Sequence, residues 1–256
     1  MTTIQQQLGE TNSYIQSIYK HRPEAGIVLG SGLSNLSAEI EVEKEISYRD
    51  IPNFPQSTVE GHDGKLLFGS ISGKRVIAMS GRFHFYEGYS AKEVAFPIRV
   101  MKNLGIENLL ISNAAGGLNP AFRVGDLMII RDHISFLTVN PLLGKNDTEL
   151  GPRFPDMSEP YSKNLIRLAE EIAGELLIDV KKGVYVGVTG PTFETRAEYK
   201  MLHLLGGDAV GMSTVQEVIV ARHAGLPVFA LSVITDIGIR EEENTITHEE
   251  VLQAAN

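Results

Sequence analysis

Apolar and polar positions follow two periods along this chain of 256 residues. Apolar side chains recur at helical spacing from Ile4 to Ile18, and Pro23 follows, so we predict a first helix that ends before the proline. Short apolar runs typical of buried strands come next. The predicted strands cover residues 26–30, 65–71, 74–79, 108–111, 126–130, 183–188 and 227–234.

Helical patterns separate many of these runs, at residues 91–104, 161–177, 195–205 and 214–224, whereas Ser72-Gly73 predicts a hairpin between 65–71 and 74–79. Strands separated by helices of this length indicate a mostly parallel sheet. No repeat or linker divides the chain. We therefore expect one α/β domain over residues 1–256, with a twisted, mostly parallel mixed sheet flanked by helices on both faces.

Several predicted strands lead directly into glycine-rich or polar loops, namely residues 30–34, 80–84, 112–117, 189–194 and 235–236. In open α/β sheets, ligands bind outside the carboxyl ends of the strands, where such loops meet. These loops are the predicted site.

Composition excludes several classes of function. A net charge of −9 argues against nucleic acid as a partner, and the absence of cysteine excludes disulfides, thiolate zinc sites and cysteine nucleophiles. The longest apolar run, residues 226–234, is far shorter than the ~18 residues that a membrane span needs. The N-terminus lacks the pattern of a signal peptide, so we expect a cytoplasmic protein without a membrane partner.

The segment 81–89 carries the densest candidate chemistry. Arg82 and His84 share strand parity, so both can face one ligand while Phe83 and Phe85 pack behind them. A guanidinium group matches phosphate, and an imidazole can donate or transfer a proton. The alternative is a solvated Arg82 beside a histidine that is hydrogen-bonded inside the fold.

Three other segments could bind an anion through their backbone or hydroxyl groups. Residues 30–34 lie between a strand and a predicted helix, which suits either phosphate or a tight turn; a dinucleotide fingerprint would need a third glycine. Residues 113–117 permit close approach of a ligand or of another element. Ser213 or Thr214 could hold phosphate or cap the next helix, and capping is the preferred interpretation from the sequence alone.

Two segments suit a planar base and a sugar. Phe193 beside Glu194 can stack on a heterocycle and accept a hydrogen bond from its ring N–H; otherwise Phe193 belongs to the core and Glu194 lies at a helix start. Thr247 and Glu250 fit a capping box, which makes His248 the first helical residue. Its neutral imidazole could then bind a hydroxyl, although an exposed histidine without function fits as well.

Taken together, these segments resemble the trimeric purine nucleoside phosphorylases. The resemblance extends from about Ala25 to the end of the chain, and residues 81–88 and 113–120 carry its most specific motifs. It implies a pentosyltransferase in which inorganic phosphate displaces the base of a purine ribonucleoside or 2′-deoxyribonucleoside. The products are the free base and the pentose 1-phosphate. Phosphate is a co-substrate, and no metal or other cofactor is implied.

The resemblance also assigns residues. It places phosphate against Ser31, His62, Arg82, His84, the Ala114 backbone and Ser213. It places the nucleoside against Tyr86, Phe154, Phe193, Glu194, Val210, Met212, Asp236 and His248. The candidate catalytic residues are His84, Glu194 and Asp236. Family members lend the equivalent of Phe154 to a neighbouring subunit, so the resemblance implies a homotrimer.

This sequence departs from the family at Asp236, where enzymes for 6-oxopurines usually carry Asn, and at Gln216, where Pro is usual. The chain also stops at Asn256, within a helix that family members generally continue. An ionised Glu194 favours hypoxanthine and guanine through their N1–H, whereas an ionised Asp236 favours the amino group of adenine. A protonated Asp236 would instead donate to N7 of either base. We expect inosine and guanosine as substrates, with some activity on adenosine.

Other functions remain compatible with these residues. A methylthioadenosine phosphorylase would need an apolar 5′ pocket, which the polar His248 argues against. A nucleosidase would use water and need no phosphate site. A nucleoside-binding protein without catalysis would leave the full set of phosphate donors unused. Release of base with and without phosphate distinguishes these possibilities.

Overall fold

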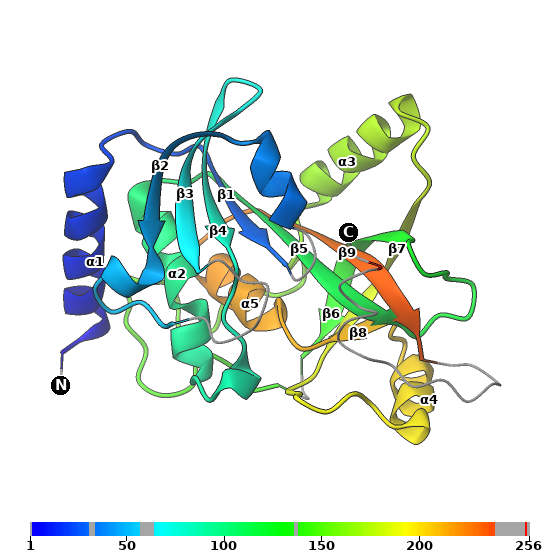
Figure 1. Cartoon of the computed structure of the whole chain (residues 1–256). Helices are drawn as coiled ribbons and strands as arrows, with labels where there is room; N and C mark the ends of the chain where they lie inside the picture. The colour runs from blue at the N-terminus through cyan, green and yellow to red at the C-terminus, as the bar shows by residue number, and fades with distance from the viewer. Residues whose placement is uncertain (1, 31–33, 57–63, 136–137, 239–253, 255–256) are drawn as a thin grey trace.

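The computed structural model describes residues 2–30, 34–56, 64–135, 138–238 and 254. Five α-helices lie within these ranges: α1 (Ile4–Ile18), α2 (Ala91–Leu104), α3 (Lys163–Glu175), α4 (Arg196–Leu204) and α5 (Val215–His223). The strands are β1 (Ala25–Leu29), β2 (Glu41–Ser47), β3 (Lys65–Ile71), β4 (Lys74–Ser80), β5 (Asn108–Gly117), β6 (Leu127–Ile134), β7 (Val180–Gly187), β8 (Ala209–Gly211) and β9 (Val228–Ile237). Short 3₁₀ helices η1 (Ser34–Glu39), η2 (Tyr48–Asp50) and η3 (Phe85–Glu87) complete the described elements (Figure 1).

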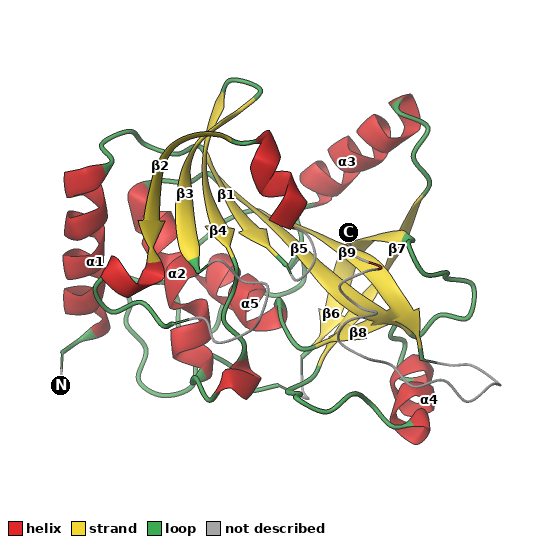
Figure 2. Ribbon diagram, in the orientation of Figure 1, coloured by secondary structure: helices red, strands yellow, loops and turns green. Residues whose placement is uncertain are grey.

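The strands form one mixed sheet in the order β2-β3-β4-β1-β5-β8-β7-β6-β9. Because β9 also pairs with β5, strands β5 to β9 close into a ring at one end of the sheet (Figure 2). β1 pairs in parallel with both β4 and β5, while β2, β3 and β4 form an antiparallel meander. The ring brings Gly116 of β5 opposite Val210 of β8 and Asp236 of β9, which positions part of the site.

Helices α1, α2 and α5 cover one face of the sheet, with α2 packed between α1 and α5 (Figure 1). The largest apolar core lies between these helices and the strands, and it includes Leu8 of α1, Ile98 of α2 and Val218 of α5. The opposite face carries a smaller cluster around Leu29, which packs near η1. The prediction of an α/β fold with covered faces is therefore confirmed.

Most predicted elements occur close to their expected bounds because their signals are local. The predicted helix 91–104 matches α2, which begins with a capping box between Ser90 and Glu93 and ends at Gly105 in a left-handed conformation. The hairpin of β3 and β4 turns at Ser72 and Gly73, as expected. No helix among the described residues is long and apolar enough to cross a membrane.

Three predictions of local structure were wrong. Residues 112–117 and 235–236 are not loops but continue β5 and β9, because closure of the ring gives their backbones partners. The predicted helix after residues 30–34 is not a regular helix, because residues 34–39 form the 3₁₀ helix η1. Strands β2 and β8 were not predicted: β2 is an edge strand rich in Glu and Lys, and β8 has only 3 residues.

Candidate active site

One cavity of about 320 Å³ lies at the ends of β5, β8 and β9. The predicted residues that line it are Arg82, His84, Tyr86, Ala114, Phe193, Glu194, Val210, Met212, Ser213 and Asp236. Ala115, Gly116, Pro191, Tyr199, Gly211 and Thr235 complete the lining. Segments that are far apart in sequence therefore meet at one place, as the loop pattern predicted.

Four predicted residues are not part of this cavity as described. Ser31, His62 and His248 lie outside the described residues. Phe154 is 86% exposed and borders a separate hollow of about 420 Å³, with the Arg153 guanidinium 5.6 Å from the centre of its ring. Within one protomer, Phe154 does not touch the cavity that the other residues share.

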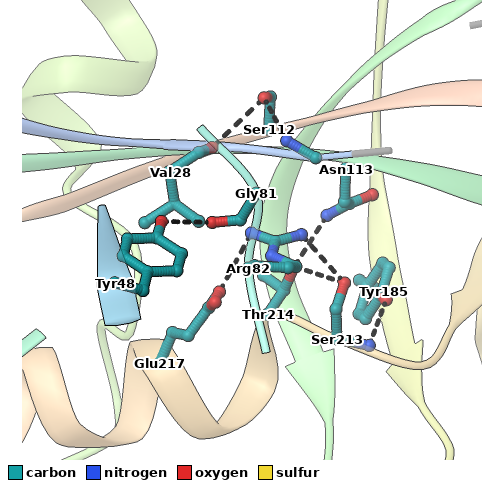
Figure 3. A network of polar contacts seen from close by, with 11 residues as sticks. Val28, Tyr48, Gly81, Arg82, Ser112, Asn113, Tyr185, Ser213, Thr214 and Glu217 are labelled. Carbon is teal, nitrogen blue, oxygen red and sulfur yellow. Dashed lines mark hydrogen bonds and ion pairs between the residues drawn. The ribbon is translucent and has the colours of Figure 1, made fainter. Parts of the chain in front are cut away.

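Arg82 is the centre of a buried polar network (Figure 3). The chain turns at Gly81, which has a φ of 99°, directly after β4. Arg82 is 1% exposed; it donates from one terminal nitrogen to the Ser213 hydroxyl at 3.0 Å and from the other to the Glu217 carboxylate at 3.0 Å. Phe83 packs behind it against Tyr48, at 5.0 Å between ring centres. Arg82 is thus an ordered, desolvated cation and not the solvated side chain of the alternative interpretation.

His84 lies beside Arg82 and is 5% exposed. Its Nδ1 is 3.1 Å from a carboxylate oxygen of Glu87, and its ring stacks on Tyr86 with centres 4.7 Å apart. Burial lowers the pKa of the imidazole below its ordinary value of 6.5, which keeps the ring neutral at pH 7. A neutral ring that donates from Nδ1 to Glu87 has Nε2 as a hydrogen-bond acceptor.

The turn before α5 presents two hydroxyl groups. Thr214 occupies the N-cap position, but its side chain makes no capping bond, and its φ is 71°. Its hydroxyl instead accepts a hydrogen bond from Asn113 of β5 at 2.9 Å, while the Ser213 hydroxyl accepts from Arg82. The capping interpretation was therefore wrong, because both hydroxyls belong to the network around Arg82.

Two carboxyl groups occupy another part of the cavity. Burial raises the pKa of Glu194 above its ordinary value, and the nearby charge of Asp236 adds to this shift, while a hydrogen bond from Tyr199 opposes it. Asp236 is 8% exposed and accepts from the Thr235 hydroxyl at 3.2 Å. A Cβ atom on Gly116 would lie 3.0 Å from an Asp236 oxygen, so glycine makes room for this carboxyl group.

The residue assignments from the sequence left out Glu217, Tyr199 and Thr235, although Thr235 lies in the predicted site segment 235–236. Thr235 precedes Asp236 in β9 and carries no pattern of its own. Tyr199 reaches the cavity from α4, three residues after its first residue. Glu217 has only the spacing of a capping box with Thr214, and that spacing predicts a helix cap, not a contact with Arg82.

The cavity therefore combines a buried cation and hydroxyl donors with an aromatic face and two carboxyl groups. Arg82 and Ser213 suit an oxyanion such as phosphate, whereas Phe193 and Glu194 suit a planar ring with an N–H group. No cluster of three or more histidine or carboxylate side chains suited to a metal ion occurs in the described ranges.

Comparisons with known proteins agree with this arrangement. A sequence profile of the phosphorylase superfamily matches residues 24–256. Purine nucleoside phosphorylase 1 of Bacillus subtilis is 54% identical over 241 residues, which cover 94% of this chain and 89% of that protein. The rat purine nucleoside phosphorylase is 48% identical over 251 residues, covering 95% and 87%.

Two solved structures, one of a Schistosoma mansoni enzyme and one of a schistosome enzyme, have the same fold. The first is a purine nucleoside phosphorylase in complex with adenosine, with a TM-score of 0.92 and 45% identity, over 97% of this chain and 90% of that one. The second, in complex with hypoxanthine, has the same TM-score, identity and coverage.

Proposed function

This chain belongs to the purine nucleoside phosphorylases of the phosphorylase superfamily, and on that premise we propose how its cavity divides the reaction between phosphate and nucleoside. The enzyme cleaves a purine nucleoside with inorganic phosphate to give the free base and a pentose 1-phosphate. We assign phosphate to the part of the cavity at Arg82 and the purine to the part at Glu194 and Asp236.

The observation that carries this assignment is the buried Arg82 beside Ser213 and His84 in the same cavity as two carboxyl groups. The Ser213 hydroxyl accepts from Arg82 and lies 3.2 Å from the Thr214 hydroxyl; with Thr214 as the donor in that contact, the Ser213 hydrogen donates to the anion. The Ala114 backbone, Ser31 and His62 complete the proposed phosphate site. A desolvated cation binds an oxyanion more strongly than an exposed one does, because water screens it less.

In the reaction, a phosphate oxygen forms a bond to C1′ of the pentose while the bond from C1′ to N9 of the base breaks. The electron pair of that bond goes to the base. Positive charge develops on the pentose, and the phosphate anion stabilises it; negative charge develops on the base, and donors at its edge stabilise that. The neutral His84 accepts a hydrogen bond from a protonated phosphate oxygen through Nε2, which favours the orientation for attack.

Recognition of the base rests on Glu194 and Asp236. An ionised Glu194 accepts from the N1–H of hypoxanthine or guanine, with Phe193 and Val210 against the ring. Two carboxylates in one cavity oppose each other's ionisation, so we assign one proton to the pair and place it on Asp236, where it can be donated to the base. The protonated acid donates to N7 and assists departure of either a 6-oxopurine or adenine. Inosine, guanosine and, to a lesser extent, adenosine are the proposed substrates.

The pentose is proposed to contact Tyr86, Met212 and His248, together with Phe154 of a neighbouring subunit. Phe154 is exposed in the protomer, which leaves it available to a second copy. We therefore propose a homotrimer with shared sites, located in the cytoplasm and requiring no cofactor besides phosphate as co-substrate.

The first test is the release of hypoxanthine from inosine with and without phosphate. We expect release only with phosphate, and equal rates without it would indicate a nucleosidase. Arg82→Ala should raise the KM for phosphate by about tenfold to a hundredfold, the cost of a hydrogen bond to a charged group, and change the KM for inosine far less. An effect on the inosine KM alone would contradict the assignment of Arg82.

A further inference from the structure

We propose that Glu217 is a positioning residue for the reaction, because it fixes the guanidinium group of Arg82 in the orientation that binds phosphate. This inference rests on the proposed function, in which Arg82 contacts the anion. Glu217 itself does not line the cavity. Its role is to hold a residue that does.

The contact is short and fully buried. A terminal nitrogen of Arg82 lies 3.0 Å from a Glu217 oxygen, and the two side chains are 1% and 3% exposed. Arg82 is the only hydrogen-bond partner that the Glu217 side chain has among the described residues. Figure 3 shows Glu217 reaching Arg82 from α5, while Ser213 reaches it from the turn before that helix. Two contacts from one short segment therefore fix both terminal nitrogens of the guanidinium.

The start of α5 shows that this contact replaces a local one. In α2 and α4, the glutamate at the third helical position bonds back to the N-cap backbone and forms a complete capping box. Thr214 and Glu217 have the same spacing, but neither bond of the box forms. The Glu217 carboxylate turns to Arg82 instead, and the Thr214 hydroxyl turns to Asn113. The helix forgoes its cap, so the pairing with Arg82 is favoured over local helix stability.

Positioning follows from the geometry of the guanidinium group. Its donors lie in one plane, so fixing two of them fixes the direction of the whole group. Without Glu217, rotation about the side-chain bonds would let the guanidinium leave the plane in which it meets Ser213 and phosphate. The carboxylate also balances the buried charge of Arg82 while no anion is bound.

The test compares two substitutions of similar size. Glu217→Gln keeps an oxygen that accepts from Arg82, whereas Glu217→Met removes it. We expect Glu217→Met to raise the KM for phosphate by about tenfold or more, and Glu217→Gln to stay within about threefold of the parent enzyme. The KM for inosine should change less than about twofold in both, since the base and pentose contacts remain. Glu93→Gln, at the same position of the α2 capping box, is the control and should leave both KM values unchanged.

A Glu217→Asp variant makes the test independent of the folding of the Met variant. It keeps the charge but is one methylene shorter, so it should raise the phosphate KM if position matters and leave it unchanged if charge alone matters. An unchanged phosphate KM in the Asp variant, an unchanged phosphate KM in a folded Met variant, or an equal rise in the KM values for phosphate and inosine would each overturn the inference. If Arg82→Ala itself leaves the phosphate KM unchanged, the proposed function fails instead.

Discussion

Removing Arg82 should harm stability and phosphate binding in ways that a second substitution separates. Arg82→Met leaves the Glu217 carboxylate buried without its hydrogen-bond partner. The double variant Arg82→Met with Glu217→Met removes both charges and keeps the side-chain volumes similar. We expect the double variant to recover stability but not phosphate binding.

The magnitudes follow from the burial of the pair. Because both side chains are at most 3% exposed, water cannot solvate a carboxylate left alone, and breaking such a pair costs about 3–5 kcal/mol of folding free energy. Replacing both partners by apolar groups is often neutral or stabilising, so the double variant should regain most of that loss. The gain would appear as non-additivity of about 3 kcal/mol in a double-mutant cycle.

The assay is urea unfolding followed by circular dichroism, without phosphate, on the parent, both single variants and the double variant. Phosphate KM values are measured on the same preparations. A double variant no more stable than Arg82→Met would refute the view that the buried, unpaired Glu217 causes the loss. A double variant with normal phosphate KM would refute the role of Arg82.

Three further predictions concern the base and the pentose. Burial raises the pKa of Glu194, so as the pH falls it should protonate before an ordinary glutamate, and kcat/KM for inosine should fall with it. Glu194→Gln should lower kcat/KM for inosine at pH 7 by about tenfold and abolish the fall of kcat/KM at low pH. If that fall persists in the variant, another group causes it. Asp236→Asn should keep inosine activity and lower the ratio of adenosine to inosine activity by about tenfold, because an amide donates to N7 but is not an acid. The ratio is measured with both nucleosides in competition, and a ratio higher than that of the parent enzyme would contradict this account. Phe154→Ala should raise the KM for inosine about tenfold and leave the fold of the protomer intact, since Phe154 is 86% exposed there and takes no part in its core. Light scattering that gives a fully active monomer would exclude the shared site.

Elements with local signals could be predicted from the sequence. Helix α2 has its cap, its apolar face and its terminal glycine within one segment, and its bounds were correct. The joint presence of Arg82 and His84 in one cavity was also predictable, because the segment 81–89 concentrates polar and aromatic residues. These features depend on neighbours in the sequence.

Closure of the ring could not be predicted, because it depends on pairing between distant strands. Gly116 and Gly117 appear as loop residues in the sequence, but the structure uses their lack of a side chain inside β5. A Cβ on Gly116 would meet Asp236, and one on Gly117 would meet Ile237. The small residues in 113–117 therefore correctly predicted that another element comes close to this segment. That the element is β9 could be identified only from the structure.

The start of α5 explains why local rules failed where the chemistry lies. A serine or threonine followed by a glutamate at capping-box spacing predicts a capped helix, and α2 and α4 obey that rule. At α5, the glutamate pairs with a buried arginine and the threonine hydroxyl accepts from an asparagine, and the φ of Thr214 is 71°. Such a conformation is unfavourable for a residue with a branched side chain, so the surrounding contacts must compensate for it. The turn before α5 thus lacks its side-chain cap and has an unfavourable φ, and the same short segment supplies the contacts of Ser213 and Glu217 with the guanidinium of Arg82.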